Sequence, residues 1–355
     1  IGTGKNNIGI PVLEGLIKRM ARDADITVFQ LYTVNKGYRA EGFDLVETYS
    51  ANPIVKTFIF LRQFRKYQKR RKFQAVHGFW AFPCGFFAVL AASVYRSRSV
   101  ISLQGGDAIS LPGLGYGQLQ KWWKRKLVLW SLARVDELIS PTRYLIDNLK
   151  KFGFRERNVN YIPLGVDSEM FSFVSKPLGK PVRFLHVGNF HPVKDHVTLL
   201  KTFQMICAVL PSHLTLIGEG VWESKIKSLA EQLHILDKIT FEGLRPHEEL
   251  PGIYHRSDVL IHTSLSEGHP IVVEEAMSCG VIVCGTSVGL LYDLPECCIA
   301  APVGDFHTLS RKILELLSDP QRLDAIRSRA RRWANENTMV KTAESIKHIY
   351  RLTAL

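Results

Sequence analysis

Three glutamates lie close together in the segment SLSEGHPIVVEEAMSCG, which spans residues 264–280. A carboxylate carries charge and accepts hydrogen bonds, and the start of a helix attracts anions through its N–H groups. Glu267 stands in a turn marked by Gly and Pro, whereas Glu274 and Glu275 fall in the helix that should follow. Acidic residues also favour a first helical turn without any function. Glu267 is therefore the stronger candidate for chemistry.

The elements around this turn are typical of a doubly wound parallel sheet, because short β-rich apolar runs alternate with segments of helical period. In the second half of the chain we expect strands at 182–187, 214–217, 239–242, 259–262, 282–284 and 298–301. The expected helices are 195–209, 221–232, 247–255 and 271–278. Glu267 then follows the strand 259–262 at its carboxyl end, where open α/β sheets bind ligands.

The first half shows the same alternation less cleanly. Strands are expected at 26–32, 73–77, 100–103, 137–140 and 159–162, and helices at 83–92, 119–131 and 144–151. The stretch FSFVSKPLGKPVR contains two prolines and a glycine and is typical of a linker. The sequence therefore predicts two α/β domains that face each other across a cleft.

The amino end, IGTGKNN, is like a Gly-rich loop between a strand and a helix, but no strand precedes it. We therefore expect the sequence to begin inside a longer natural chain. The loop is not a P-loop, because Asn6 stands where a hydroxyl residue should follow Lys5. A flexible start and a phosphate-facing loop that includes Gly4 remain open as alternatives.

The segment SEGHPIVVEEAMSCGVIVCGTSVG resembles the signature of the retaining glycosyltransferases of family 4, which have the GT-B fold and an E-x7-E motif. Seven residues separate Glu267 from Glu275, so this spacing selects Glu275 and leaves Glu274 as an ordinary helix-start carboxylate. The resemblance covers residues 135–355 well and the earlier part weakly. It continues in order through SPTRYLIDNLKKFG, YIPLGVDSEMF, FLHVGNFHPVKDHVTLL, LTLIGEG, ITFEGL and YHRSDVLIHTS.

This resemblance implies a GT-B architecture of two Rossmann-like doubly wound domains. Residues 1–175 would form the acceptor domain, whose first strand we expect to be missing from this sequence, and residues 176–335 would bind a nucleotide-sugar donor. Residues 336–355 would form a helix that packs back on the first domain.

The resemblance also implies roles for individual residues. Glu267 would hold the hydroxyls of the donor sugar, and Glu275 would accept hydrogen bonds from the ribose. Lys194 would stabilise the departing diphosphate. Further donor contacts are expected from the loop after the first strand of the second domain, from the start of the helix after Glu267, and from a turn near the base. These residues are Gly188, Asn189, Gly268, Ile271, Val272, Gly243 and Leu244.

Two positions depart from the family pattern. Asn189 stands where many members have Arg, so one phosphate cation is missing, and His191 lies nearby. Gln104 stands where many members have a His near the reaction centre. Gln donates and accepts hydrogen bonds but does not carry a proton as imidazole does, so its expected role is orientation of the donor. His77 is either another cleft residue or a structural one.

The excess of basic residues lies entirely in the first half of the chain. Residues 1–175 hold 26 Lys and Arg against 13 Asp and Glu, while the remainder holds 20 of each. The segment 62–72 has seven basic residues in eleven, and KWWKRK at 121–126 joins four basic residues to two tryptophans. Interfacial tryptophans beside Lys and Arg favour a membrane surface, although charge runs are usually solvated faces. The expected contacts with anionic membrane are Arg62, Arg65, Lys66, Lys69, Arg70, Lys121, Trp122 and Trp123.

Nucleic acid is the weaker alternative as a partner for this basic half, because no nucleic-acid-binding module is recognisable. The sequence contains no apolar run long enough to cross a bilayer. Its six cysteines are scattered, as in a reducing compartment. We therefore expect a cytoplasmic protein, at the inner face of the membrane if the basic half binds lipid.

No metal or other cofactor is expected. The DAD motif at 23–25 precedes a strand instead of ending one, so a solvated turn is the better interpretation. The resemblance implies transfer of a hexose from a nucleotide-sugar to a glycan or lipid-linked acceptor, with retention, in polysaccharide or envelope glycan biosynthesis. The alternatives are a sugar-nucleotide epimerase of the same architecture and a noncatalytic nucleotide- or glycan-binding scaffold. Donor, acceptor and linkage are not encoded in any general motif.

Overall fold

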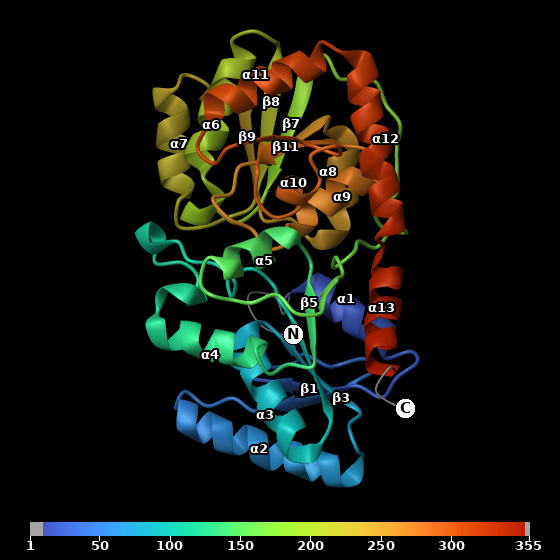
Figure 1. The fold of residues 1–355 in the computed structure, drawn as a ribbon. Helices are drawn as coiled ribbons and strands as arrows, with labels where there is room; N and C mark the ends of the chain where they lie inside the picture. Colours follow the sequence, from blue (N-terminus) through green and yellow to red (C-terminus); the bar gives the residue numbers. More distant parts are fainter. Residues whose placement is uncertain (1–9, 352–355) are drawn as a thin grey trace.

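The structure is a computed structural model that describes residues 10–351. It has two α/β domains, one above the other in Figure 1. Every strand pairing within the named sheets is parallel, so the predicted fold class is confirmed. The strands are β1 (Thr27–Gln30), β2 (Asp44–Glu47), β3 (Ala75–Phe79), β4 (Arg98–Ser102), β5 (Glu137–Ser140), β6 (Val159–Tyr161), β7 (Val182–Val187), β8 (Ser212–Ile217), β9 (Ile239–Gly243), β10 (Val259–His262), β11 (Ile282–Thr286) and β12 (Ile299–Ala301).

Helices cover both faces of the sheets (Figure 1). The α-helices are α1 (Pro11–Met20), α2 (Pro53–Arg70), α3 (Phe86–Tyr95), α4 (Trp122–Leu132), α5 (Arg143–Lys150), α6 (His196–Cys207), α7 (Glu223–Gln232), α8 (Leu250–Arg256), α9 (Ile271–Cys279), α10 (Leu290–Asp293), α11 (Phe306–Leu317), α12 (Pro320–Glu336) and α13 (Met339–Arg351). The short turns are η2 (Ala81–Gly85), η3 (Pro112–Leu114), η4 (Gln118–Gln120), η5 (Pro192–Lys194), η6 (Leu236–Lys238) and η7 (His247–Glu249).

The carboxyl-terminal domain contains a six-stranded sheet in the order β12-β11-β10-β7-β8-β9. The predicted strands 182–187 and 259–262 are found with those bounds as β7 and β10. All four residues of β10 are buried, as expected for a parallel strand covered by helices on both faces. The strand order reverses between β7 and β10, which makes this pair the topological switch point of the sheet.

The amino-terminal domain holds a four-stranded sheet, β3-β4-β5-β6, and a separate two-stranded sheet, β1-β2. Within residues 10–351 no strand lies between β1 and β3. A cavity of about 1030 Å³ lies there instead, lined by residues of both strands, such as Phe29 and Val76. The single sheet expected of a Rossmann-like domain is therefore divided in the described part of the chain.

Several helices of the first half differ from prediction. The expected helix 83–92 begins as a π turn, and its α-helical part, α3, starts only at Phe86. The expected helix 119–131 begins at Trp122, because residues 118–120 form a separate 3₁₀ turn. Helices α1 and α2 were not predicted. The charge run at 62–72 hid α2, whose buried side, at Phe60 and Phe64, packs on an aromatic cluster.

The chain crosses between the domains twice. Gly165 lies against the backbone of Met339, and a Cβ on this glycine would lie 2.5 Å from the Met339 nitrogen. Beyond this crossing, α13 packs on α1, and both helices bury apolar side chains such as Leu16 and Ile346 in one cluster. Figure 1 shows α12 beside the upper domain and α13 beside the lower one.

Two findings concern the expected absence of a membrane-spanning segment and the expected unpaired cysteines. No helix in the described part of the chain is long and apolar enough to span a bilayer. All six cysteines are unpaired thiols.

Candidate active site

Glu267 lies in the turn after β10, and its Oε1 atom receives three contacts. Lys194 Nζ donates to it over 2.5 Å and Ser264 Oγ over 2.6 Å, while His262 Nε2 lies 3.4 Å away. Burial raises the pKa of the Glu267 carboxyl, but Lys194 and His262 together lower it by more, so the pKa is held well below its ordinary value. The side chain is therefore a fixed carboxylate, with 16% of its surface exposed.

Lys194 reaches Glu267 from the turn after β7, the strand next to β10 at the switch point. It ends η5, the short turn between β7 and α6. Two hydrogen bonds join this turn to the loop after β10: Thr263 Oγ1 donates to the Lys194 carbonyl over 3.2 Å, and Leu265 N donates to the Val193 carbonyl over 2.8 Å. The cation and the carboxylate are thus held at the carboxyl ends of β7 and β10.

A cavity of about 860 Å³ opens beside this pair, between the two domains. Tyr116 of the amino-terminal domain lines it, and its ring centroid lies 6.2 Å from that of His191. Burial raises the pKa of the Tyr116 hydroxyl, and the charge of Glu267 adds to this effect. The remaining lining residues belong to the carboxyl-terminal domain and are Asn189, Phe190, His191, Val193, Lys194, Glu219, Gly220, Val221, Glu223, Ser266 and Glu267.

Glycines let two loops that carry lining residues of this cavity approach each other. A Cβ on Gly218 would lie 2.1 Å from the Gly188 oxygen, and one on Gly220 would lie 2.6 Å from the Phe190 oxygen. The predicted residue Gly188 borders Lys194, whose Cε would be 3.5 Å from a Cβ there. The segment LIGEG is part of the family resemblance, but no role was predicted for its Glu219, which lines the cavity.

Glu275 occupies a different environment from Glu267. It is buried in α9 and does not line the cavity. Its Oε1 lies 2.7 Å from His247 Nε2, and its Oε2 accepts a hydrogen bond of 2.8 Å from the Tyr254 hydroxyl. The hydrogen bond to Glu275 raises the pKa of His247. Burial raises the pKa of Tyr254 well above its ordinary value, and Glu275 raises it further.

Glu274 stands in the first turn of α9, as predicted, but its burial was not foreseen. It is fully buried, and its Oε2 lies 2.9 Å from Nε2 of His269, whose side chain is also fully buried. A buried carboxylate needs such a partner, because removal from water without one is costly. The sequence contained the pair at a spacing of five residues, but the helix-start pattern offered a simpler explanation.

Gln104 lies where the two domains touch. Its carbonyl oxygen would be 2.3 Å from a Cβ on Gly268, so only glycine fits at that position. The Nε2 atom of Gln104 is buried and has no hydrogen-bond partner within residues 10–351. The loop is shaped by Asp107, which accepts hydrogen bonds from the backbone N–H groups of Gln104, Gly105 and Ala81. Sequence reasoning missed this role of Asp107.

The other predicted donor residues lie around the same end of the sheet. Ile271 and Val272 begin α9, and both are partly exposed. Gly243 ends β9 and Leu244 is 45% exposed, but neither lines the cavity. Gly4 lies outside the described residues.

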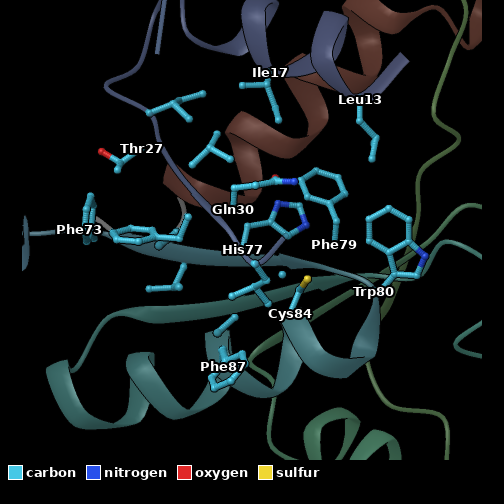
Figure 2. Close-up of a pocket in the computed structure, with 18 of the residues that line it drawn as sticks. Leu13, Ile17, Thr27, Gln30, Phe73, His77, Phe79, Trp80, Cys84 and Phe87 are labelled. Carbon is cyan, nitrogen blue, oxygen red and sulfur yellow. The ribbon is translucent and has the colours of Figure 1, made fainter. Parts of the chain in front are cut away.

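His77 does not lie at the cleft. It lines the cavity between β1 and β3, which Figure 2 shows in close-up with His77, Phe79 and Cys84 among the lining side chains. Its ring bonds to the Tyr350 hydroxyl at 2.6 Å and to Ser102 Oγ at 2.8 Å. Burial lowers the pKa of His77 to about 3. Of its two predicted roles, the structural one fits these contacts.

A basic and aromatic surface lies on the amino-terminal domain. The predicted basic residues of α2 are exposed, and so are Lys121, Trp122 and Trp123 at the start of α4. A chain of ring contacts joins the two helices, from Phe60 through Phe87, Phe86 and Phe82 to Trp123. The start of α2 adds three exposed apolar residues that sequence reasoning missed: Ile54, Val55 and Phe58.

The motif at 23–25 is remote from this chemistry. Asp23 pairs with Lys347 at 2.5 Å, and Asp25 is exposed near Arg71. In the described ranges no three His, Cys, Asp or Glu side chains are grouped so that they could hold a metal ion.

Two parallel-sheet domains that meet at a cleft, with a lysine and a carboxylate at the switch point, are the architecture expected of GT-B glycosyltransferases. Family comparisons agree with this class. Residues 12–170 match the family Glycosyltransferase Family 4, and residues 167–333 match the family Glycosyl transferases group 1. The chain belongs to these glycosyltransferases, with one family domain in each half.

Known proteins similar to the chain include glycosyltransferases from bacteria. N-acetyl-alpha-D-glucosaminyl L-malate synthase of Bacillus anthracis is 24% identical over 272 residues, which are 71% of this chain and 68% of that protein. The putative colanic acid biosynthesis glycosyltransferase WcaL of Salmonella typhimurium is 26% identical over 213 residues, which are 56% of this chain and 52% of that protein. The match thus spans from about half to two thirds of these relatives.

Solved structures share this fold. Anabaena HepE, whose crystal structure is a complex with UDP and glucose, superposes with a TM-score of 0.77 at 15% identity. The superposition covers all of this chain and 98% of HepE. This similarity establishes the two-domain architecture of the chain.

Proposed function

We propose that the protein transfers a hexose, with retention and without a metal ion, from a nucleotide-sugar to a glycan or lipid-linked acceptor in envelope glycan biosynthesis. The observation that carries this proposal is the Lys194–Glu267 pair at the edge of the interdomain cavity. A cation and a carboxylate held in one site suit a donor that has an anionic diphosphate at one end and sugar hydroxyls at the other.

Lys194 stabilises the negative charge that develops on the diphosphate as the glycosidic bond breaks. Glu267 accepts hydrogen bonds from the hydroxyls of the donor sugar. Gln104 orients the sugar through its side-chain nitrogen, which has no partner in the described part of the chain. The acceptor attacks on the face from which the diphosphate departs, and a phosphate oxygen takes the acceptor's proton.

Glu275 binds the ribose in this proposal. Its carboxylate already holds His247 and Tyr254, so it has to use its remaining lone pairs or exchange one of these partners. Asn189 lines the cavity in place of a second cation, which leaves the diphosphate with Lys194 and with His191 beside it.

The identity of the nucleotide-sugar donor is tested first, by measuring which nucleotides bind. UDP, GDP, ADP and their sugar conjugates are compared in a thermal-shift screen, because a bound ligand raises the apparent stability. The best conjugate is then incubated with glycan and lipid-linked acceptors, and the anomeric configuration of the product is determined by NMR. Retention is the expected result, and inversion would contradict the proposed mechanism.

Variants and controls complete this test. Glu267→Gln and Lys194→Ala should each abolish most of the transfer, whereas Glu315→Gln, which changes an exposed carboxylate on α11, should not. Incubation without acceptor separates the epimerase alternative, since only an epimerase changes the sugar of the free nucleotide-sugar. A protein that binds the nucleotide-sugar and transfers it to no acceptor would be a scaffold.

We further propose that the basic and aromatic surface brings the enzyme to the anionic inner face of the cytoplasmic membrane. Lys124 and Lys126 lie over the rings of Trp123 and Trp122, at 5.5 Å and 5.2 Å. Each basic residue near an anionic leaflet contributes about 1 kcal/mol, and exposed tryptophans suit the headgroup region.

Vesicle sedimentation tests this surface. Binding to vesicles that contain phosphatidylglycerol should fall at high salt and in Trp122→Ser. The matched control is Val209→Ser, which removes a similarly exposed apolar side chain from the other domain. Binding that is unaffected by salt, or binding to RNA in preference to vesicles, would contradict the membrane proposal.

A further inference from the structure

The turn that carries Glu267 is held from the opposite domain on both of its sides. Thr142 Oγ1 donates a hydrogen bond of 2.9 Å to the carbonyl of Gly268. The Tyr144 hydroxyl lies 3.0 Å from Ser266 Oγ. Thr142, Ser266 and Gly268 are all buried, so these contacts are sheltered from water. The residues immediately before and after Glu267 are thus fixed by the amino-terminal domain.

Both of these side chains come from the start of α5, which lies at the junction of the two domains in Figure 1. A threonine at the N-cap usually accepts a hydrogen bond from its own helix. Thr142 makes no such bond, because its hydroxyl faces Gly268 instead. The first N–H groups of α5 therefore need another acceptor.

Asp293, at the end of α10 in the carboxyl-terminal domain, supplies that acceptor. Its Oδ2 accepts from Arg143 N over 2.6 Å, and its Oδ1 accepts from Tyr144 N over 3.1 Å. A carboxylate at a helix start is stabilised both by these N–H groups and by the helix dipole. The helix of one domain is therefore capped by a residue of the other.

A second contact supports the same junction. The ring centroids of Tyr144 and Tyr292 lie 5.5 Å apart, and the Tyr292 hydroxyl donates to Asp147 Oδ2 over 3.2 Å. Tyr292 precedes Asp293, so one short segment contacts both the first N–H groups of α5 and the Asp147 side chain of the same helix.

We propose that Thr142, Tyr144 and Asp293 form an interdomain latch that positions Glu267 for reaction, so that the donor-sugar site is complete only while the latch is closed. This inference rests on the proposed function of Glu267. The three latch residues are positioning residues: they act on Glu267 through Ser266 and Gly268. Lys194 lies outside the latch, because its turn is joined to the loop after β10 within one domain. Nucleotide binding and sugar transfer should therefore respond differently to the latch.

The test compares the wild type with Thr142→Val, Tyr144→Phe and the double variant. Each lost hydrogen bond should lower kcat by about 2- to 10-fold, and the double variant by about 4- to 100-fold. The Kd of the nucleoside diphosphate should change by less than about twofold, since 0.4 kcal/mol corresponds to that factor. Thr142→Ser keeps the hydroxyl and should restore kcat. If Thr142 and Tyr144 only stabilised the fold, their substitution would lower thermal stability, and kcat and Kd would change together.

A second measurement does not depend on sugar transfer. Asp293→Ala removes the cap of α5, and small-angle X-ray scattering should then show a larger radius of gyration than for the wild type. Thermal unfolding identifies any variant that fails to fold, and Tyr144→Phe, which keeps its ring against Tyr292, is the mildest of the set.

The outcomes separate the two proposals. If the wild type transfers no sugar but Asp293→Ala expands the molecule, the proposed function has failed and the latch still closes the domains. If the double variant keeps the wild-type kcat, or if Kd rises as much as kcat falls, the positioning role is overturned. An unchanged radius of gyration in Asp293→Ala would overturn the latch itself.

Discussion

Lys194 Nζ lies 2.5 Å from Glu267 Oε1, and the two residues follow the adjacent parallel strands β7 and β10. They are 73 positions apart in the sequence. The strand order reverses between these strands, and the interdomain cavity opens beside the pair. In this structure each side chain partly satisfies the charge of the other.

The first prediction concerns competition within this pair. A diphosphate that binds Lys194 has to compete with Glu267 for the same ammonium group. Glu267→Gln should therefore leave the affinity for the nucleoside diphosphate unchanged or increase it, while it abolishes transfer. Lys194→Ala should weaken that affinity by about 10- to 100-fold, as expected for a charged hydrogen bond of about 1.5–3 kcal/mol. Isothermal titration calorimetry measures both.

The control for this prediction is Lys201→Ala, which removes a lysine from the following helix, α6. It should bind the nucleotide as the wild type does. Weaker nucleotide binding by Glu267→Gln would show that Glu267 does not compete with the diphosphate.

The second prediction concerns pH. The hydrogen bond to Glu275 raises the pKa of His247 above its ordinary value of 6.5, so the folded state favours the protonated ring. This stabilisation is fully present below pH 6.5 and is lost as the pH rises through the higher pKa of the folded protein. Urea unfolding should give a lower free energy of unfolding at mildly alkaline pH than at acidic pH. His247→Asn should reduce that difference, and an undiminished difference would contradict it.

The third prediction concerns the contact between the domains at Gly268. A Cβ there would lie 2.3 Å from the Gln104 oxygen and 2.5 Å from the Gly105 Cα, and both are backbone atoms. Gly268→Ala should therefore force the domains apart and lower transfer by at least about tenfold, as for a loss of about 1.4 kcal/mol. The matched control is Gly113→Ala, because no atom lies within 4 Å of a Cβ at that site. Wild-type transfer by Gly268→Ala would show that close approach is not required.

The fourth prediction concerns Asp107. This fully buried carboxylate accepts hydrogen bonds from three backbone N–H groups, at 2.8, 2.9 and 3.2 Å. Asp107→Ala leaves these groups buried without an acceptor, at about 1–3 kcal/mol for each. We expect a loss of at least about 3 kcal/mol in the free energy of unfolding, measured by urea denaturation, and a smaller loss for Asp107→Asn, which keeps one acceptor oxygen. Equal stability of wild type and Asp107→Ala would contradict this interpretation.

The carboxyl-terminal domain was predicted more accurately than the amino-terminal one. Strands β7 (VRFLHV) and β10 (VLIH) are buried over almost all of their residues, so most of their side chains are apolar and mark the strand in the sequence. Helix α2 instead exposes a basic face, and its few buried residues, Phe60 and Phe64, were obscured by the charge around them. The π turn before α3 has no sequence signal of its own.

For the site, the Gly- and Pro-marked turn singled out Glu267, and the family resemblance added Lys194 and Glu275. The sequence did not reveal that Glu267 and Lys194 are paired or that Glu275 is already bound to His247 and Tyr254. The buried pair of Glu274 and His269 was missed for the same reason. A sequence motif shows which residue types follow one another along the chain. It does not show which residue of another helix or strand will pack against them.

The sequence alone determined the α/β class, the division into two domains and the loops that carry the candidate chemistry, because periodicity, turn residues and motif order are local properties of the chain. The tertiary structure decided which of these residues meet. It placed Lys194 against Glu267 across the switch point, and it placed Thr142, Tyr144 and Asp293 across the junction of the domains. Such contacts depend on the register of strands and the closure of one domain on the other, which no local pattern specifies.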